Sequence, residues 1–380
     1  MTATRFDLFR VLGITIRVDP SWFFLAIFLI GTLGLDSYPQ LYPELSPTVT
    51  TLMGLIAALG FFASIILHEL GHALVARHYG VETRGITLFL FGGVAELTDE
   101  PPHPEAELLI ALAGPFISFN LAAWLGLVWL VEATGDGSPI ISGIVGLLAF
   151  SNTMLAIFNL VPAFPLDGGR VLRAVLWFFQ GDLTRATRIT AGIGGVFGFA
   201  LIAVGIAALL SGNVLNGVWW VLLGLFLRGA GQLAYRHVLT THALAGEKVR
   251  AFMQRDPITV PRSISVLQMV EEFVGRHAVA VFPVVDGDRL VGQITAQQLR
   301  GIPREEWDRQ SVGAVADRCT DADTVSPDDD ARLALSQMSR ARASHLMVVE
   351  ENRLVGILLL RDLLAPRPDL PLEGSPSATG

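Results

Sequence analysis

Long apolar segments separated by short polar ones fill the first 240 residues of the chain. A helix of roughly 20 apolar residues crosses the hydrocarbon core of a bilayer. Six segments come close to this length, with approximate bounds 19–36, 51–76, 107–131, 140–165, 189–210 and 215–235. The first has no small-residue cleavage site after it, so we expect a retained anchor rather than a signal peptide. The pattern predicts an α-helical polytopic membrane domain over residues 1–240, with six transmembrane helices.

A different pattern lies between the second and third apolar segments, in residues 80–100 (GVETRGITLFLFGGVAELTDE). Its β-branched and aromatic residues, with Gly92 and Gly93 in the middle, predict a short β-hairpin. The segment is too short and too charged at its ends to cross a membrane. It could be an ordinary cytoplasmic loop. Alternatively, its edge could pair with an extended peptide, which makes Gly92 and Gly93 candidate substrate-binding residues.

Charge is spread unevenly: residues 1–240 hold 11 of the 27 Lys and Arg and 15 of the 35 Asp and Glu. About one residue in nine is therefore charged there, against about one in four in residues 241–380, as in soluble domains. The net charge of −8, without a basic block, argues against nucleic acid as a partner. Cys319 is the only cysteine, which excludes a disulfide scaffold.

The arginines predict the orientation of the membrane domain. They precede the first apolar segment and follow the second, fourth and sixth, whereas the connections 37–50, 132–139 and 211–214 contain no Lys or Arg. Positively charged loops stay on the cytoplasmic side of a membrane. We therefore expect a multi-pass protein of the cell membrane, surrounded by membrane lipid, with both termini in the cytoplasm.

The soluble part is an internal repeat with a spacing near 64 residues. VVDGDRLVGQITAQQL (284–299) aligns with VVEENRLVGILLLRDLL (348–364), and each unit predicts strand, helix, strand, strand, helix. This repeat resembles a tandem pair of α/β CBS domains. The resemblance implies a first CBS domain over 246–302 and a second over 311–366, and we expect a disordered tail over 367–380.

The resemblance to CBS domains implies adenine nucleotide as a possible ligand, with a Thr or Ser and an Asp three residues later holding the ribose. The first unit keeps Thr295 but has Gln298 at the Asp position, and the second keeps Asp362 but has Leu359 at the Thr position. Neither pair is complete. Nucleotide binding therefore stays open, and a CBS-mediated homodimer is at least as good an interpretation.

The strongest chemical signal is HELGH, which begins at His68 inside the second apolar segment. In a helix, His68 and His72 lie one turn apart on one face, so both imidazoles can bind one Zn²⁺. Glu69 points about 100° around the helix from His68 and can take a proton from water that the metal activates. Because ionisable residues inside a membrane span are unfavourable and usually functional, the motif predicts a zinc site.

A third metal ligand is available in NLVPAFPLDGGR, residues 159–170, at the end of the fourth apolar segment. Pro162 and Pro165 cannot continue a helix, so we expect the chain to unwind there, which a membrane tolerates only where the backbone lines a cavity. In the predicted topology this motif and HELGH both lie near the cytoplasmic ends of their segments. We therefore expect Asp167 to complete the site.

Together, HELGH and NLVPAFPLDGGR resemble the site-2 protease family of intramembrane zinc metalloproteases, in its six-span form with C-terminal CBS domains. The resemblance implies His68, His72 and Asp167 as ligands of one Zn²⁺ per chain and Glu69 as the general base. It also implies that Asn159 polarises the scissile carbonyl, and that AGPFISFN (113–120) is the family's AGP segment. The implied substrates are transmembrane proteins such as single-span anti-sigma factors.

Other interpretations are open at this stage. A CBS-regulated transporter or channel would explain the CBS pair and a buried acid, but it would leave the HExxH pattern a coincidence. Asn159 could be an ordinary interhelical hydrogen bonder, and we expect residues 113–115 to serve close helix packing. The remaining polar residues of the spans are expected to be packing groups: Ser118, Asn120 and Asn152. The remaining histidines are expected to be surface or core residues: His78, His103, His237, His242, His277 and His345.

Overall fold

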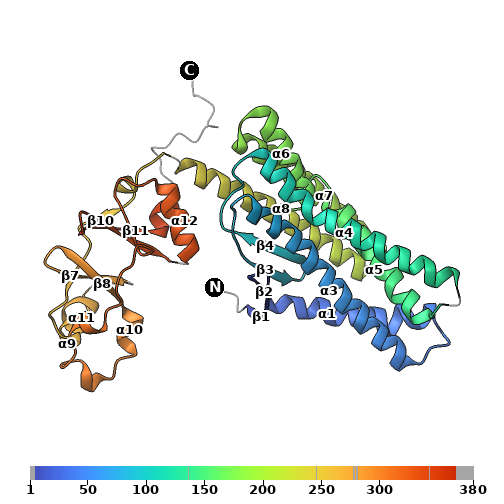
Figure 1. The fold of residues 1–380 in the computed structure, drawn as a ribbon, viewed down its shortest axis with the longest axis horizontal. Coiled ribbons are helices and arrows are strands. Elements are labelled where there is room, and N and C mark those ends of the chain that lie inside the picture. The colour runs from blue at the N-terminus through green and yellow to red at the C-terminus, as the bar shows by residue number, and fades with distance from the viewer. Residues whose placement is uncertain are drawn as a thin grey trace. The chain divides into compact units, whose positions relative to one another are not determined.

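The structure, a computed structural model, describes residues 5–364 apart from 136, 245, 277, 278, 280 and 342. The chain forms two compact units, Met1–Val238 and Leu239–Gly380. Figure 1 shows a bundle of long helices for the first unit and a smaller α/β body for the second. The predicted tail over 367–380 lies outside the described residues.

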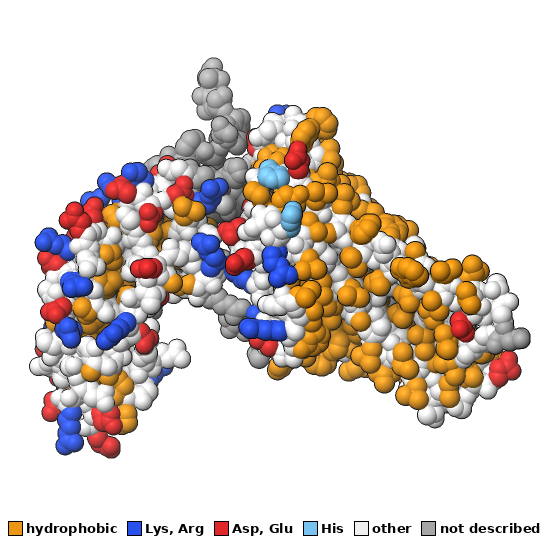
Figure 2. All heavy atoms as spheres, viewed as in Figure 1, with side chains coloured by type: hydrophobic (Ala, Val, Ile, Leu, Met, Phe, Trp, Pro, Cys, Tyr) orange, Lys and Arg blue, Asp and Glu red, His pale blue; other side chains and the backbone are white. Residues whose placement is uncertain are grey.

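Within the described residues, six helices are long and apolar enough to cross a membrane, which confirms the predicted number. Four of them start at a proline, which is favourable at the first helical position because its missing N–H would have no partner there. Figure 2 shows hydrophobic side chains spread over the surface of these helices, as expected for contact with lipid. The spans are Pro20–Leu41 (α1 Pro20–Gly31, a π-helical segment Thr32–Ser37 and α2 Tyr38–Leu41), α3 Pro47–His78, α4 Pro104–Thr134, α5 Pro139–Asn159, α7 Leu183–Leu210, and Val214–Arg236 within α8 (Val214–Ala243).

The fourth span ends earlier than predicted. The helix α5 stops at Asn159, not near residue 165, because Pro162 and Pro165 cannot donate to a helical hydrogen-bond ladder. After a non-helical stretch, a further helix that was not predicted, α6, runs from Asp167 to Gln180. A Cβ on Gly168 would lie 2.2 Å from the carbonyl oxygen of Leu160, so only glycine lets this stretch fold back over α6.

A four-stranded sheet lies beside the helices in the first unit, in the order β1-β2-β3-β4. The strands β3 (Thr83–Phe89) and β4 (Gly92–Leu97) form the predicted hairpin, although Gly92 and Gly93 lie in β4 and not in the turn. The antiparallel pair β1 (Phe6–Val11) and β2 (Ile14–Val18) was not predicted, and β2 runs parallel to β3. Because β4 is the last strand in this order, one of its edges has no strand beside it.

The second unit is a duplicated α/β fold, as the repeat predicts. Its sheet has the order β6-β7-β8-β11-β10-β9, with β5 (Gln254–Arg255) beside β11, so the two repeats meet at β8 and β11. Each repeat packs short helices over its strands around a separate apolar core. The other elements are β6 Val260–Pro261, α9 Val266–Met269, β7 Val281–Asp286, β8 Arg289–Thr295, α10 Ala296–Arg300, α11 Val312–Val315, β9 Thr324–Val325, α12 Ala331–Ala341, β10 His345–Glu350, β11 Arg353–Leu359 and α13 Leu360–Leu364.

Candidate metal centre

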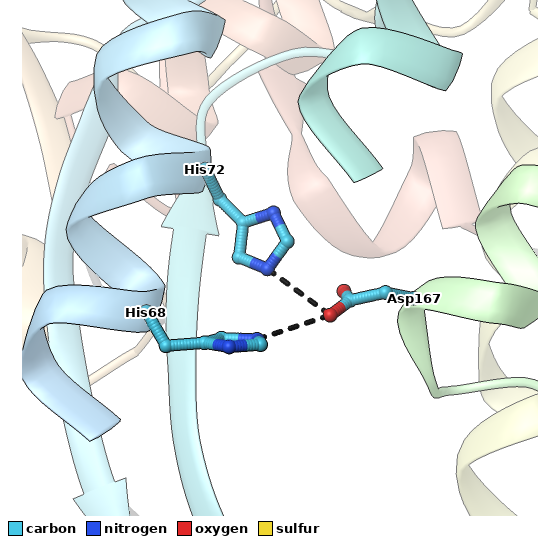
Figure 3. Close-up of side chains that lie close together, drawn as sticks. All are labelled: His68, His72 and Asp167. Carbon is cyan, nitrogen blue, oxygen red and sulfur yellow. Dashed lines mark hydrogen bonds and ion pairs between the residues drawn. The ribbon is translucent and has the colours of Figure 1, made fainter. Parts of the chain in front are cut away.

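The structure brings the three predicted metal ligands together (Figure 3). His68 and His72 project from one face of α3, and Asp167 is the first residue of α6. The Nε2 atoms of His68 and His72 lie 3.1 and 3.2 Å from the same carboxylate oxygen of Asp167. All three residues are buried, so water and lipid are largely excluded from this point.

The donor atoms fit a tetrahedral Zn²⁺ ion. Two ligand atoms at the usual zinc distances of about 2.0–2.1 Å are about 3.3 Å apart in a tetrahedral site, close to the separations observed here. The Ile110 carbonyl oxygen can only accept, so Nδ1 of His72 donates to it over 2.6 Å. In a neutral imidazole, the Nε2 lone pair then faces the carboxylate of Asp167, an arrangement that a cation between the two groups would stabilise.

A second partner orients the other histidine. Nδ1 of His68 lies 2.8 Å from Oγ of Ser118, which projects from α4. Outer hydrogen bonds of this kind fix the rotation of an imidazole that binds a metal. Ser118, which was expected to be a packing group between helices, thus also contacts a candidate ligand through its hydroxyl.

Space for an ion comes from Gly114 on α4. A Cβ built on Gly114 would lie 2.1 Å from Nε2 of His72 and 2.6 Å from Nε2 of His68. The first distance is about that of a zinc–nitrogen bond. Any side chain at position 114 would thus occupy the room that a metal ion needs, so this part of the 113–115 segment does more than pack helices.

Glu69, the candidate general base, lies between the helices and the sheet. Its Oε2 accepts a hydrogen bond of 3.0 Å from the backbone N–H of Ala95 in β4. A Cβ on Gly93 would lie 2.8 Å from Cγ of Glu69, so the lack of a side chain in β4 allows this close approach. The carboxylate is therefore one residue from His68 on α3 and in contact with the edge strand.

An ion-pair network that the sequence analysis missed fixes α6. Arg173 on α6 donates from Nε to Glu107 on α4 over 2.6 Å and from its other end to Glu100 over 3.2 Å. Its guanidinium also lies 5.3 Å from the ring centre of Phe164, in the stretch that precedes Asp167. Glu107 is fully buried. An acidic residue in an apolar segment could have indicated such a network from the sequence. The network holds α6 against α4 and so keeps Asp167 facing α3.

Other predicted polar residues form hydrogen bonds to groups other than the three ligands. Asn159 ends α5, and its amide donates to the carbonyl oxygen of Leu155 in the same helix. Asn152 donates to Ser64 of α3, as expected of a packing group. His103 accepts from the N–H of Ala106 and thereby caps α4. His277 lies outside the described residues, as do the side chains of His237 and His242.

The residues at the two incomplete ribose positions of the CBS pair form hydrogen bonds with other residues of the CBS unit. The hydroxyl of Thr295 accepts from the N–H of Gln298 and caps α10, while the side chain of Gln298 donates to Asp317. In the second repeat, Asp362 accepts from Gln254 over 2.8 Å. The bond from Gln254 to Asp362 thus joins the start of the first repeat to the end of the second.

Sequence comparison identifies both parts of the chain. Residues 56–135 and 137–204 match the profile of Peptidase family M50, and residues 249–304 and 312–366 match that of the CBS domain. Rip3 of Mycobacterium tuberculosis, which bears the name of a zinc metalloprotease, is 34% identical over 93% of this chain and 90% of its own length.

Two further matches come from Methanocaldococcus jannaschii. Zinc metalloprotease MJ0392 is 31% identical over 96% of this chain and 97% of its own length. A solved structure described as a site-2 protease is 32% identical, covers 60% of this chain and 94% of its own, and has a TM-score of 0.45. On the profile matches and the near-complete alignments, the chain belongs to peptidase family M50, the site-2 proteases, and is a zinc metalloprotease with six membrane helices and a tandem CBS pair.

Proposed function

We propose that this protein cleaves transmembrane segments of membrane proteins at the site formed by His68, His72, Asp167 and Glu69. The convergence of the three ligand atoms around the space left by Gly114 carries this proposal. Zn²⁺ held by these ligands would polarise the scissile carbonyl and make water a better nucleophile near neutral pH.

Residues of the chain would then carry out the proton transfer. Glu69 would accept a proton from the attacking water at its carboxylate and return it to the amide nitrogen that leaves. Ser118 and the Ile110 carbonyl would hold the two imidazoles in place during the reaction. Asn159 is the proposed donor to the scissile carbonyl, for which its amide would have to leave the carbonyl of Leu155.

The substrate would bind as an extended strand along the free edge of β4. Ile86 and Ala95 are paired across β3 and β4, and the N–H of Ala95 donates to Glu69. Alternate residues of an edge strand present their N–H and C=O groups to the same side, so Gly93 faces the same way as Ala95. Pairing there would bring a substrate backbone alongside Glu69. Gly92 and Gly93 are thus the proposed substrate-binding residues, and single-span anti-sigma-factor-like proteins are the proposed substrates.

The proposed organisation follows the charge pattern. A protease domain over 1–240 would lie in the plasma membrane with both termini in the cytoplasm, since the arginine-free connections would face outward. Two CBS domains over 246–302 and 311–366 would follow in the cytoplasm. They would bring two chains together as a homodimer or respond to an adenine nucleotide.

A cleavage assay with the purified full chain tests the function. Wild-type protein in lipid nanodiscs is mixed with a single-span membrane protein and the products are identified by mass spectrometry. We expect cuts inside the span with wild type and none with Glu69→Gln, which should keep its zinc because it removes only the proton acceptor. A Glu69→Gln protein that cleaves within about tenfold of the wild-type rate would contradict the assigned mechanism.

A further inference from the structure

A groove lies between α7 and α8, on two helices that carry none of the proposed catalytic residues. Its volume is about 430 Å³, within the range of roughly 300–1,000 Å³ for small-molecule sites. Residues of both helices line it, among them Arg188, Gly192, Val196 and Phe199 from α7 and Arg228 and Tyr235 from α8.

The surroundings of the glycines show where α7 and α8 are in contact and where they separate. A Cβ on Gly198 would lie 2.7 Å from the carbonyl oxygen of Gly224, so α7 and α8 are in close backbone contact at that level. One to two turns nearer the start of α7, a Cβ on Gly192 or Gly195 would meet nothing within 4 Å. The groove therefore opens toward the end of the helix pair that carries Arg188 and Tyr235.

The groove holds two positive charges that no described acid neutralises. Arg228 is eight residues before Arg236, so its Cα lies about 12 Å from that of Arg236 along the helix axis, inside the apolar span. Among the described residues its guanidinium contacts the ring of Phe199, at 5.9 Å, and no carboxylate. Arg188 likewise has no described ion pair. An arginine within a span is unfavourable unless an anion or trapped water accompanies it.

The wall of the groove is apolar and faces outward. Val196 is 74% exposed and Phe199 is 63% exposed, so both side chains would contact hydrocarbon in a membrane. The ligand must thus combine a negative charge for the two arginines with an apolar chain for this wall. Free phosphate meets only the first of these requirements, whereas an anionic lipid meets both.

We propose that this groove binds one anionic phospholipid. The phosphate would lie between the guanidinium groups of Arg188 and Arg228, with Tyr235 and Gln232 beside the glycerol. One acyl chain would run over Val196 and Phe199. Basic pockets between transmembrane helices commonly hold anionic headgroups in this manner.

Native mass spectrometry of the full chain, titrated with phosphatidylglycerol or with phosphatidylcholine of the same acyl chains, tests the proposal. An arginine near a membrane surface contributes about a fivefold change in the affinity for anionic lipid. We therefore expect one tightly retained phosphatidylglycerol for wild type, about fivefold weaker binding for Arg188→Gln, and a further loss of at least about fivefold for the double variant Arg188→Gln/Arg228→Gln, because Arg228 lies deeper in the span. Arg185→Gln is the matched control, because Arg185 lies one turn earlier on α7 and does not line the groove.

Several results would overturn the proposal. Equal affinity of wild type and Arg188→Gln would do so even if the double variant fails to fold, since Arg188 is exposed near the start of α7. Equal retention of phosphatidylcholine would show that charge is not recognised. Displacement of the lipid by inorganic phosphate would assign the site to a free anion, and a co-purified peptide in its place would assign it to a protein.

Discussion

Replacing Gly114 by alanine should remove the metal while leaving every candidate ligand in the sequence. The added Cβ would lie 2.1 and 2.6 Å from Nε2 of His72 and His68, respectively. Carbon and nitrogen atoms that are not bonded to each other approach to roughly 3.5 Å at best. At least one imidazole would have to move by about 1 Å, whereas metal ligands tolerate displacements of only about 0.2 Å.

The expected effect on zinc affinity is a loss of at least about 100-fold, or about 2.8 kcal/mol. The substitution should not destabilise the helix itself, because alanine is favoured over glycine inside a helix by about 1 kcal/mol. The variant should therefore insert and fold. The assay is zinc content per purified chain, together with cleavage of a membrane-span substrate.

Gly126→Ala on the same helix is the matched control. Its Cβ would meet only the Cβ of Ala149, at 4.0 Å, so this variant should keep both zinc and activity. A Gly114→Ala protein with a full complement of zinc and wild-type cleavage would refute the assignment of this space to the metal.

Three further predictions concern the ion-pair network and the CBS unit. Arg173→Ala leaves Glu107 buried without its main partner, so it should lower the free energy of unfolding by about 3–5 kcal/mol and weaken zinc binding. Arg262→Ala, which removes one partner of an exposed ion pair, should change the free energy of unfolding little in the same denaturation assay. Burial holds the pKa of His345 below its usual value, and the negative charge of Asp323 partly offsets this effect. The folded state thus favours the neutral imidazole. The contribution of His345 to the free energy of unfolding is therefore complete above about pH 6.5 and falls as the pH decreases. Hydrogen exchange in β10 at pH 7.5 and 5.5 should show this loss in wild type and not in His345→Gln. Because the residues at both ribose positions are engaged in hydrogen bonds within the CBS unit, ATP or AMP should change cleavage by less than about threefold. Micromolar nucleotide affinity by calorimetry would contradict this.

The features that depend on local sequence could be predicted well. Apolar length alone identifies the six helices, and the 64-residue repeat predicts the succession of strands and helices within each CBS domain. The ends of elements were less predictable, since Pro162 stops α5 before the apolar segment ends. The β1–β2 hairpin was missed because its strands are short, although the alternation around Leu12 and Gly13, both with positive φ, was a usable signal.

The candidate site was predictable only in part, for a physical reason. Helical spacing relates His68 to His72, and the predicted topology places Asp167 at a similar depth, where it can complete the site. The contribution of Gly114 and Ser118 depends on how α4 packs across α3, which no local pattern contains. The same holds for the contact between Glu69 and β4 and for the pairing of Arg173 with Glu107, because each joins elements far apart in the chain.

X-ray absorption at the zinc edge of the purified full chain tests the central claim most directly. We predict about one zinc per chain, with nitrogen and oxygen neighbours at about 2.0–2.1 Å, and loss of this signal in Asp167→Ala. A shell of sulfur at about 2.3 Å would place the metal at Cys319, the only cysteine. That result, or well-folded wild-type protein without zinc, would contradict the assignment of His68, His72 and Asp167 as the metal ligands.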